Sequence, residues 1–377
     1  MKINANTELL KNALAAAAAF CSARSTMPIL ANVRLGADFG SLVISATNLT
    51  AGATIGMPCA VQEPGVTTVN AGDILGIIST LEAEFVTIET DQAGTNLQIT
   101  CPGYKGKLPT IAASEFPLIK SEMPETKFSV PTAQFIAALN AVTLTASKDD
   151  SRPVLTGIEF TMTADCIQMA ATDGYRLTVD RIEAGTGIPE KTTLVVPARN
   201  LELIAKLAKD AGEAMEIGFT ESDFCAAFAA GDGSGQTALI GSAVYDPKFP
   251  DYRAIVPKTQ TTKVAVSAAQ LKKATQLAML ADKKKVRIIE FDFGPDELTL
   301  SATSDTGQAA AQVATQMEGA PLTIKFNGAY ILDMITGMPN DALMFEMTTP
   351  SRPAAIYSFT AGKDAHLAIL MPMHPGR

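Results

Sequence analysis

The side chains that most often carry out covalent or metal chemistry are few and scattered in this chain. Its two histidines, His366 and His374, lie near the C-terminus without the spacing of a metal-ligand pair. The cysteines are odd in number, with no two-residue-spaced pair, and stand at Cys21, Cys59, Cys101, Cys166 and Cys225. This pattern indicates reduced, mostly buried thiols in a cytoplasmic protein.

Motifs of the common enzyme classes are missing as well. No segment has the glycine pattern of a phosphate-binding or dinucleotide-binding loop, and none has the serine elbow of hydrolases. We therefore expect no catalytic residue, no metal and no cofactor. An enzyme that uses scattered Asp and Cys residues on a repeat scaffold stays open as an alternative, and an assay for nuclease or hydrolase activity separates the two.

The net charge of -9 limits how the chain could hold a nucleic acid. A protein that grips DNA mainly through phosphate contacts is normally basic and salt-sensitive, so tight non-specific DNA binding is not expected here. Apolar runs are far shorter than the roughly 18 residues of a membrane helix, and polar residues interrupt the N-terminus where a secretory signal would lie. We expect no membrane partner.

Three segments of the chain repeat one order of elements. They begin KINANTELLKNAL at Lys2, KFSVPTAQFIAAL at Lys127 and KVAVSAAQLKKAT at Lys263, and each predicts a short strand followed by an amphipathic helix. The i, i+3, i+4, i+7 pattern predicts the buried helix positions Leu10, Ala13, Leu14 and Ala17, then Phe135, Ala138, Leu139 and Val142, then Leu271, Ala274, Thr275 and Ala278.

Two further landmarks follow in each copy. An alternating strand ends in Ala-Thr-polar at Asn48, Asp173 and Ser304, and another strand then enters a second helix after Thr67, Thr192 and Leu322. Asp73 and Asn200 stand near the starts of these second helices, where capping side chains are favoured.

The spacing of the landmarks supports a true repeat. From first to second copy, the three offsets are each 125 residues, from Leu10 to Phe135, from Thr47 to Thr172 and from Thr68 to Thr193. From second to third copy they are 136, 131 and 130 residues, measured at Leu271, Thr303 and Thr323. Polar, proline-bearing stretches divide the chain into three domains, 1–124, 125–257 and 258–377.

Four segments carry a resemblance to a known family. TMPILANV at 26–33, ATDGYRLTV at 171–179, DPKFPDYRAIVP at 246–257 and MPM at 371–373 resemble the beta subunit of bacterial DNA polymerase III, the sliding clamp family. The resemblance implies an α+β fold of three repeated clamp domains, each with two helices packed on antiparallel sheets. It also implies a head-to-tail homodimer that forms a ring of six domains around duplex DNA.

A geometric estimate agrees with two chains per ring. Twelve lining helices spaced about 10 Å apart give a circumference of about 120 Å and a diameter of about 38 Å, whereas the six helices of one chain give only about 19 Å. A closed ring needs no affinity for sequence, because enclosure prevents dissociation while weak phosphate contacts allow sliding.

The resemblance implies that polymerases and the clamp loader insert a short peptide between the second and third domains. The matching residues, mostly apolar, are Arg152, Leu155, Thr172, Gly174, Tyr175, Leu177, Pro250, Ile255, Tyr330, Pro353, Ile369, Leu370, Met371, Pro372 and Met373. Taken alone, Asp173-Gly174 indicates a hairpin turn, and both interpretations hold together. Beyond the motif the chain continues with His374, Pro375, Gly376 and Arg377.

The same resemblance places basic residues at the hole of the ring and apolar residues at the seam between subunits. The DNA-facing candidates are Arg24, Lys148, Arg199, Lys206, Lys209, Lys272 and Lys273, each of which could equally be a solvated surface charge. The seam candidates are Leu108, Met279 and Leu280.

The implied function is a processivity subunit that tethers the replicative polymerase, the DNA polymerase III catalytic subunit, and other proteins with clamp-binding motifs. The alternative is an interaction protein that keeps the clamp fold but no longer closes a ring. A dimer of about 79 kDa, twice the 39.5 kDa chain, favours the clamp, and a monomer favours the alternative.

Overall fold

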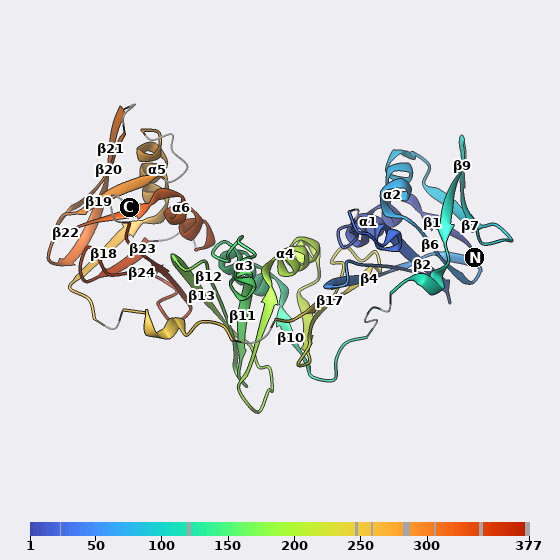
Figure 1. Ribbon diagram of the computed structural model, residues 1–377, viewed down its shortest axis with the longest axis horizontal. Coiled ribbons are helices and arrows are strands. Elements are labelled where there is room, and N and C mark those ends of the chain that lie inside the picture. Colours follow the sequence, from blue (N-terminus) through green and yellow to red (C-terminus); the bar gives the residue numbers. More distant parts are fainter. Residues whose placement is uncertain are drawn as a thin grey trace. The chain divides into compact units, whose positions relative to one another are not determined.

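The chain folds into three copies of one strand-and-helix pattern (Figure 1). This computed structural model describes residues 1–22, 24–117, 119, 122–245, 248–257, 259–281, 287–304, 307–338 and 342–373. In each copy a strand leads into a helix, strands follow, a further strand leads into the second helix, and three strands close the copy. The predicted order of elements is therefore confirmed.

The elements of the first copy are β1 Lys2–Asn6, α1 Thr7–Ala18, β2 Asn32–Asp38, β3 Ser41–Thr47, β4 Ala51–Pro58, β5 Ala60–Glu63, β6 Gly65–Asn70, α2 Ala71–Thr80, β7 Phe85–Thr90, β8 Asn96–Cys101 and β9 Tyr104–Ile111. Those of the second are β10 Lys127–Pro131, α3 Thr132–Thr143, β11 Gly157–Met162, β12 Cys166–Thr172, β13 Arg176–Glu183, β14 Thr192–Pro197, α4 Ala198–Leu207, β15 Ala214–Phe219, β16 Asp223–Ala229 and β17 Thr237–Ala243. Those of the third are β18 Thr262–Ser267, α5 Ala268–Met279, β19 Ile288–Phe293, β20 Glu297–Ser304, β21 Gly307–Gly319, β22 Leu322–Asn327, α6 Gly328–Gly337, β23 Ala342–Met347, β24 Ala354–Ser358 and β25 His366–Leu370. Short 3-10 turns lie at Pro28–Ala31, Ala113–Glu115, Pro153–Thr156, Ala208–Asp210 and Tyr252–Ala254.

The helices form where their apolar faces and caps predict them. All twelve predicted inward positions of α1, α3 and α5 are buried. Asn6 and Ser267 cap α1 and α5 by accepting hydrogen bonds from backbone N–H groups of the first turn. The cap of α2 is Asn70, whose Oδ1 accepts from the Asp73 N–H at 3.1 Å, so the expected cap at Asp73 was wrong by three residues.

The strands form two antiparallel sheets, which belong to two compact units. A sheet with the order β10-β15-β16-β17-β4-β3-β2-β6-β9-β8-β7-β1-β5 lies in the unit of residues 1–136 and 203–244. A sheet with the order β14-β11-β12-β13-β25-β24-β23-β18-β21-β20-β19-β22 lies in the unit of residues 137–202 and 245–377. The boundary between units therefore passes through the second copy, while each sheet runs on from one copy into the next.

Strand pairing between successive copies follows one rule. In the first unit, β4 pairs with β17 in the register Ala51↔Ser242. In the second unit, β13 pairs with β25 in the register Arg176↔Leu370. Since β4 and β13 are equivalent strands of their copies, and β17 and β25 are each the last strand of the following copy, the two junctions are built alike.

The turn before each of these strands is also repeated in detail. The Thr47 Oγ1 donates to the Ala51 carbonyl at 2.8 Å, and the Thr172 Oγ1 donates to the Arg176 carbonyl at 2.7 Å. Asn48 accepts from two following N–H groups in the first turn, as Asp173 does in the second. The sequence repeat is thus matched at the level of single hydrogen bonds.

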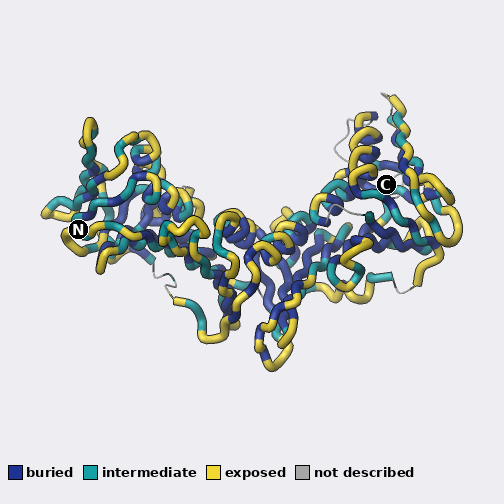
Figure 2. Tube along the Cα trace, turned by 180° about the vertical axis from the view of Figure 1, so that it is seen from behind, coloured by how far each residue is buried: buried dark blue, intermediate teal, exposed yellow. Residues whose placement is uncertain are grey.

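Each unit is held by apolar side chains between its sheet and its helices. Figure 2 shows buried segments along strands and helices, with exposed segments at turns. In the second unit, Phe291 and Phe326 pack edge to face at 5.3 Å between ring centroids, and Phe293 lies 5.6 Å from Phe345. Such aromatic pairs add about 0.5–1.5 kcal/mol each beyond the area that they bury.

Candidate functional site

A tight turn in the second unit positions one end of the candidate peptide site. Gly174 has a φ of 90°, a conformation that side chains with a Cβ rarely adopt, and its N–H donates to the Thr172 Oγ1 at 3.0 Å. The Tyr175 N–H donates to the Asp173 Oδ1 at 2.9 Å. The predicted hairpin turn is confirmed, and its geometry leaves the Tyr175 side chain 60% exposed.

Arg176 fixes this turn to a helix of the third copy and was missed by the sequence reasoning. Its Nε donates to the Asp173 Oδ2 at 3.0 Å and its Nη1 donates to the Asp333 Oδ2 at 2.6 Å. Its guanidinium also lies over the Tyr330 ring, 4.3 Å from the centroid. Arg176 is nearly buried, so this is a well-shielded network. The Asp-X-X-Arg spacing inside ATDGYRL is the signal that could have identified it.

The apolar floor of the site is the paired strands β13 and β25. Leu177 stands opposite Ile369, and Ile369 stands opposite Ala355 of β24. All three are almost fully buried, in a cluster with Ala170 and Tyr252. The C-terminal strand β25 is thus paired on both sides, with β13 and with β24.

Several apolar side chains of the predicted set remain accessible around this floor. Tyr175 is 60% exposed, Ile255 is 46% exposed and Met371 is 36% exposed. The Met371 N–H donates to the Tyr175 carbonyl at 3.0 Å, which brings the terminal motif beside the turn. Exposed apolar groups that surround a rigid sheet are typical of a surface that anchors a partner's side chains.

The segment 248–257 lies across the same sheet face. Tyr252 is buried there, and its hydroxyl accepts from the Gln168 Nε2 at 2.6 Å. Burial, and then the nearby Glu159 carboxylate, raise the pKa of Tyr252 to about 12. Burial also raises the pKa of Glu159, although Arg253 and Tyr252 partly oppose this. Tyr252 thus anchors the segment on the buried cluster, while Pro250 and Ile255 on either side of it stay exposed.

The remaining predicted residues lie on elements next to this floor. Leu370 is buried opposite Ala354, which directly follows Pro353, and the Met373 N–H donates to the Lys325 carbonyl at 2.7 Å. Arg152 is exposed and Leu155 is buried, just before and within the 3-10 turn that enters β11. Pro372 is partly buried, and residues 374–377 lie outside the described residues.

All seven predicted DNA-facing residues have exposed side chains. Arg199 and Lys206 lie on α4, Lys209 lies in the following 3-10 turn, and Lys272 and Lys273 lie on α5. Arg24 and Lys148 follow α1 and α3. These helices bury their other faces, so the basic groups are held on stable helical surfaces that water or a polyanion can reach.

The seam candidates differ in how much surface they offer. Leu108 on β9 is partly buried, and Leu280 at the end of α5 is 72% exposed. Met279 is only 9% exposed and packs against Gly328 in the core of its own unit. Leu277, which the sequence reasoning did not select, is 46% exposed. The exposed apolar surface at this end of α5 thus comes from Leu277 and Leu280.

The described part of the chain has neither a metal-binding cluster nor a membrane-spanning helix. Within it, no three His, Cys, Asp or Glu side chains are arranged to hold a metal ion. No helix in the same residues is both long enough and apolar enough to cross a membrane.

Three family models together match nearly the whole chain in order. The N-terminal, central and C-terminal domains of the DNA polymerase III beta subunit match residues 1–120, 129–251 and 253–374. The beta sliding clamp of Streptomyces coelicolor is 28% identical over 381 residues, covering 99% of each chain. That of Synechococcus elongatus is 25% identical and covers 98% of each. The crystal structure of the Bacillus subtilis DNA polymerase sliding clamp is similar with a TM-score of 0.91 at 21% identity, covering 100% of both chains.

Proposed function

The chain belongs to the DNA polymerase III beta subunit family, and we propose from this premise that it encircles duplex DNA as a sliding clamp. The observation that carries the proposal is the ordered match of all three family domains over a chain whose own repeat has the same three parts. The family is a non-catalytic accessory subunit, so the protein is a processivity factor and not an enzyme. Its role is to hold the replicative polymerase on DNA.

The strand-pairing rule between copies supports a head-to-tail dimer. By equivalence with β4 and β13, β21 should pair with the last strand of a following first copy, which is β9. In the described residues, β21 pairs over Gly307–Ala314 with β20 alone, and β9 pairs over Tyr104–Pro109 with β8 alone. Each strand therefore presents a free backbone edge, and the two edges complement each other between two copies.

The first helix of each copy supports the same contact between subunits. Ala16, Ala141 and Leu277 occupy one position of the first helix in the three copies, by the offsets of 125 and 136 residues. Ala141 contacts Gly337 at the end of α6, since a Cβ built on Gly337 would lie 3.1 Å from the Ala141 Cβ. In a dimer, Leu277 would meet the partner's Thr80, which is the last residue of α2 as Gly337 is the last residue of α6. We propose Leu277 and Leu280 beside Leu108 as the apolar part of the seam.

A closed ring explains how a protein with a negative net charge can stay on DNA, which is also negatively charged. With a net charge of -9, the chain has no excess of positive charge that could hold a polyanion tightly. A ring retains DNA by topology, and a few exposed cations suffice for sliding contacts. We propose that Arg24, Lys148, Arg199, Lys206, Lys209, Lys272 and Lys273 supply those contacts, and that the protein acts in the cytoplasm, where bacterial replication takes place.

The second function is partner docking at the surface around Leu177 and Ile369. We propose that peptide segments of the polymerase, the clamp loader and other clamp-binding proteins insert apolar side chains between Tyr175, Ile255 and Met371. The rigid turn held by Arg176 supports the proposal, because a preformed site loses little entropy on binding. Flexible methionine allows several partners to use one surface.

Loading onto circular DNA tests the proposal directly. A cognate clamp loader and ATP should deposit the protein on a nicked circular plasmid, where it co-elutes with the DNA in gel filtration at high salt. Linearising the plasmid should release it, because the ring slides off the ends. Retention on linear DNA without blocked ends, or failure to load despite dimer formation, would contradict encirclement. A 39.5 kDa monomer at micromolar concentration would favour the clamp-fold interaction protein instead.

A further inference from the structure

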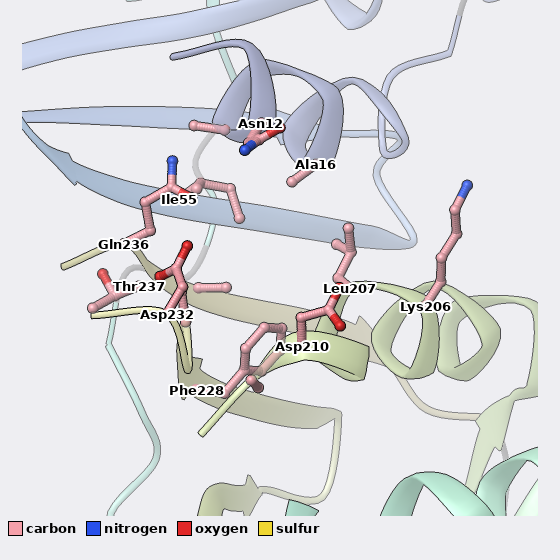
Figure 3. Close-up of a pocket in the computed structure, with 14 residues that line it drawn as sticks. Asn12, Ala16, Ile55, Lys206, Leu207, Asp210, Phe228, Asp232, Gln236 and Thr237 are labelled. Atoms are coloured by element: carbon pink, nitrogen blue, oxygen red, sulfur yellow. The ribbon is translucent and has the colours of Figure 1, made fainter. Parts of the chain in front are cut away.

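A cavity of about 350 Å³ lies in the first unit between α1 and the end of α4, over strands β4 and β17 (Figure 3). Ala13 and Ala16 of α1 form one wall, and Leu207 lies opposite. Ile55 and Phe228 contribute the largest apolar side chains of its lining. Its volume is at the lower end of the roughly 300–1,000 Å³ that is typical of small-molecule pockets.

The equivalent place in the second unit is closed. By the repeat offsets, Ala16 corresponds to Ala141 and Leu207 corresponds to Gly337. A Cβ built on Gly337 would lie 3.0 Å from the Ala141 Cα, so those two helices are in direct contact. In the first unit the residue at the glycine position is leucine, and both equivalent residues line open space. The two junctions therefore differ in how closely their helices approach at this position.

The polar groups of the lining include acceptors and donors, with Lys206 and Thr237 among the donors. They include the carboxylates of Asp210 and Asp232 and the amides of Asn12 and Gln236. The Gln236 Nε2 donates one of its two N–H groups to the Leu9 carbonyl at 2.6 Å, which fixes the orientation of this amide. Figure 3 shows that the Lys206 side chain extends away from the other labelled groups. The lining thus combines apolar side chains with two separate carboxylates.

Hydrogen bonds from Ser234 fix the Asp232 carboxylate and favour its ionised form. Its Oδ1 accepts from the Ser234 N–H at 2.9 Å. Hydrogen bonds from the Ser234 side chain and backbone lower the pKa of Asp232, so the carboxylate is ionised at neutral pH. A ligand ammonium group would form a charge-assisted hydrogen bond there.

We propose that this cavity binds a small amphiphilic cation, an aryl- or alkyl-ammonium compound whose apolar part lies against Ile55 and Phe228 while its ammonium group faces Asp232. An anionic analogue is disfavoured, since it would place its charge beside the Asp232 carboxylate. The proposal is independent of ring closure and of peptide docking.

Calorimetric titration of the full-length protein with 2-phenylethylamine tests it. We expect saturable one-site binding with a Kd on the order of 1 mM, as for a very small ligand. The carboxylate analogue 3-phenylpropionate, of similar shape, should show no saturable binding. Absence of saturation with the amine, or equal binding of the two compounds, overturns the proposal.

Two variants with matched controls locate the site. Ala16→Leu should abolish amine binding because its side chain fills the cavity, whereas Ala15→Leu, an exposed α1 position outside the lining, should leave the Kd unchanged. Asp232→Asn keeps the acceptor for Ser234 and should weaken binding about 10-fold, in line with the loss of a charged hydrogen bond. Glu221→Gln, at an exposed turn, is its control. Binding that survives both cavity variants would assign the amine to another place and refute the inference.

Discussion

The Arg176 Nη1 donates to the Asp333 Oδ2 at 2.6 Å, and this bond joins residues 157 positions apart in the chain. It connects the turn of the second copy to α6 of the third. Because Arg176 is nearly buried while the Asp333 side chain is 41% exposed, the two partners contribute unequally to stability. The guanidinium also stacks on Tyr330, so its removal affects three neighbours at once.

Arg176→Met should lower the free energy of unfolding by about 2 kcal/mol, because Asp173 then loses a shielded partner. Asp333→Asn should lower the free energy of unfolding by less than about 1 kcal/mol, since the carboxylate that it removes is partly solvated in the folded protein. Urea unfolding of both single variants and the double variant measures the coupling. Equal losses of unfolding free energy in the two single variants would contradict the unequal contributions of Arg176 and Asp333.

Tyr175→Ala and Met371→Ala should each weaken binding of a polymerase tail peptide by about 10-fold without affecting the melting temperature, since both side chains are accessible. Fluorescence polarisation with a labelled peptide measures this. Phe39→Ala, at a 98% exposed position of the other unit, should bind normally. A charged residue at Leu177 is a poor probe, because Leu177 is fully buried and the variant would unfold. Full affinity in both variants would remove the docking surface from this face.

Leu277→Glu combined with Leu280→Glu should convert the dimer of about 79 kDa into a monomer of 39.5 kDa, because two charges then enter an apolar seam. Light scattering at micromolar concentration reports the mass. Phe39→Glu should remain dimeric, because Phe39 lies in the turn between β2 and β3 and on neither of the proposed seam elements, β9 and α5.

A cysteine pair distinguishes the proposed seam from any other dimer. Leu277→Cys with Thr80→Cys should give a disulfide-linked dimer on mild oxidation, since the repeat places these positions opposite each other across two copies. Either single variant should stay unlinked on a denaturing gel. If the double variant fails to cross-link although it is dimeric, the helices meet elsewhere.

Glu346 predicts a pH dependence of stability in the third copy. Burial by itself raises its pKa, but hydrogen bonds from Lys363 at 2.7 Å and Tyr357 at 2.8 Å outweigh burial and lower it. Because the folded pKa lies below the unfolded value of about 4.3, the ionised carboxylate stabilises the fold above that pH. This contribution is lost as pH falls through the folded pKa. The stability difference between the wild type and Glu346→Gln should therefore shrink from pH 7 to pH 3 in urea titrations, and a constant difference would contradict the assignment.

The sequence predicted what depends on local periodicity. Leu10, Phe135 and Leu271 are buried at equivalent helix positions because a 3.6-residue repeat directly encodes which face is apolar. The cap of α2 was misplaced because β6 enters the helix without a loop, so Asn70 is both the last strand residue and the cap. Boundaries of this kind depend on backbone geometry and are poorly marked by residue type.

The candidate site was predictable in its members but not in their roles. Leu177 and Ile369 were selected from the resemblance, yet only strand pairing reveals that they form a buried floor and that Tyr175 and Met371 form the accessible rim. The Asp173–Arg176 spacing could have marked Arg176, but its second partner, Asp333, lies 157 residues away and has no local sequence signal. Leu277 was missed because only its 46% exposure in the folded chain distinguishes it from the buried Met279.

The pairings of β4 with β17 and of β13 with β25 have a consequence for dissecting the protein. A fragment cut at residue 124 would leave the β4 edge without its neighbour, and bare edges of this kind invite aggregation. Stable recombinant pieces should instead follow the compact unit formed by residues 1–136 and 203–244, which requires a short artificial linker in place of residues 137–202. The borders of the compact units therefore differ from the borders of the three repeated copies.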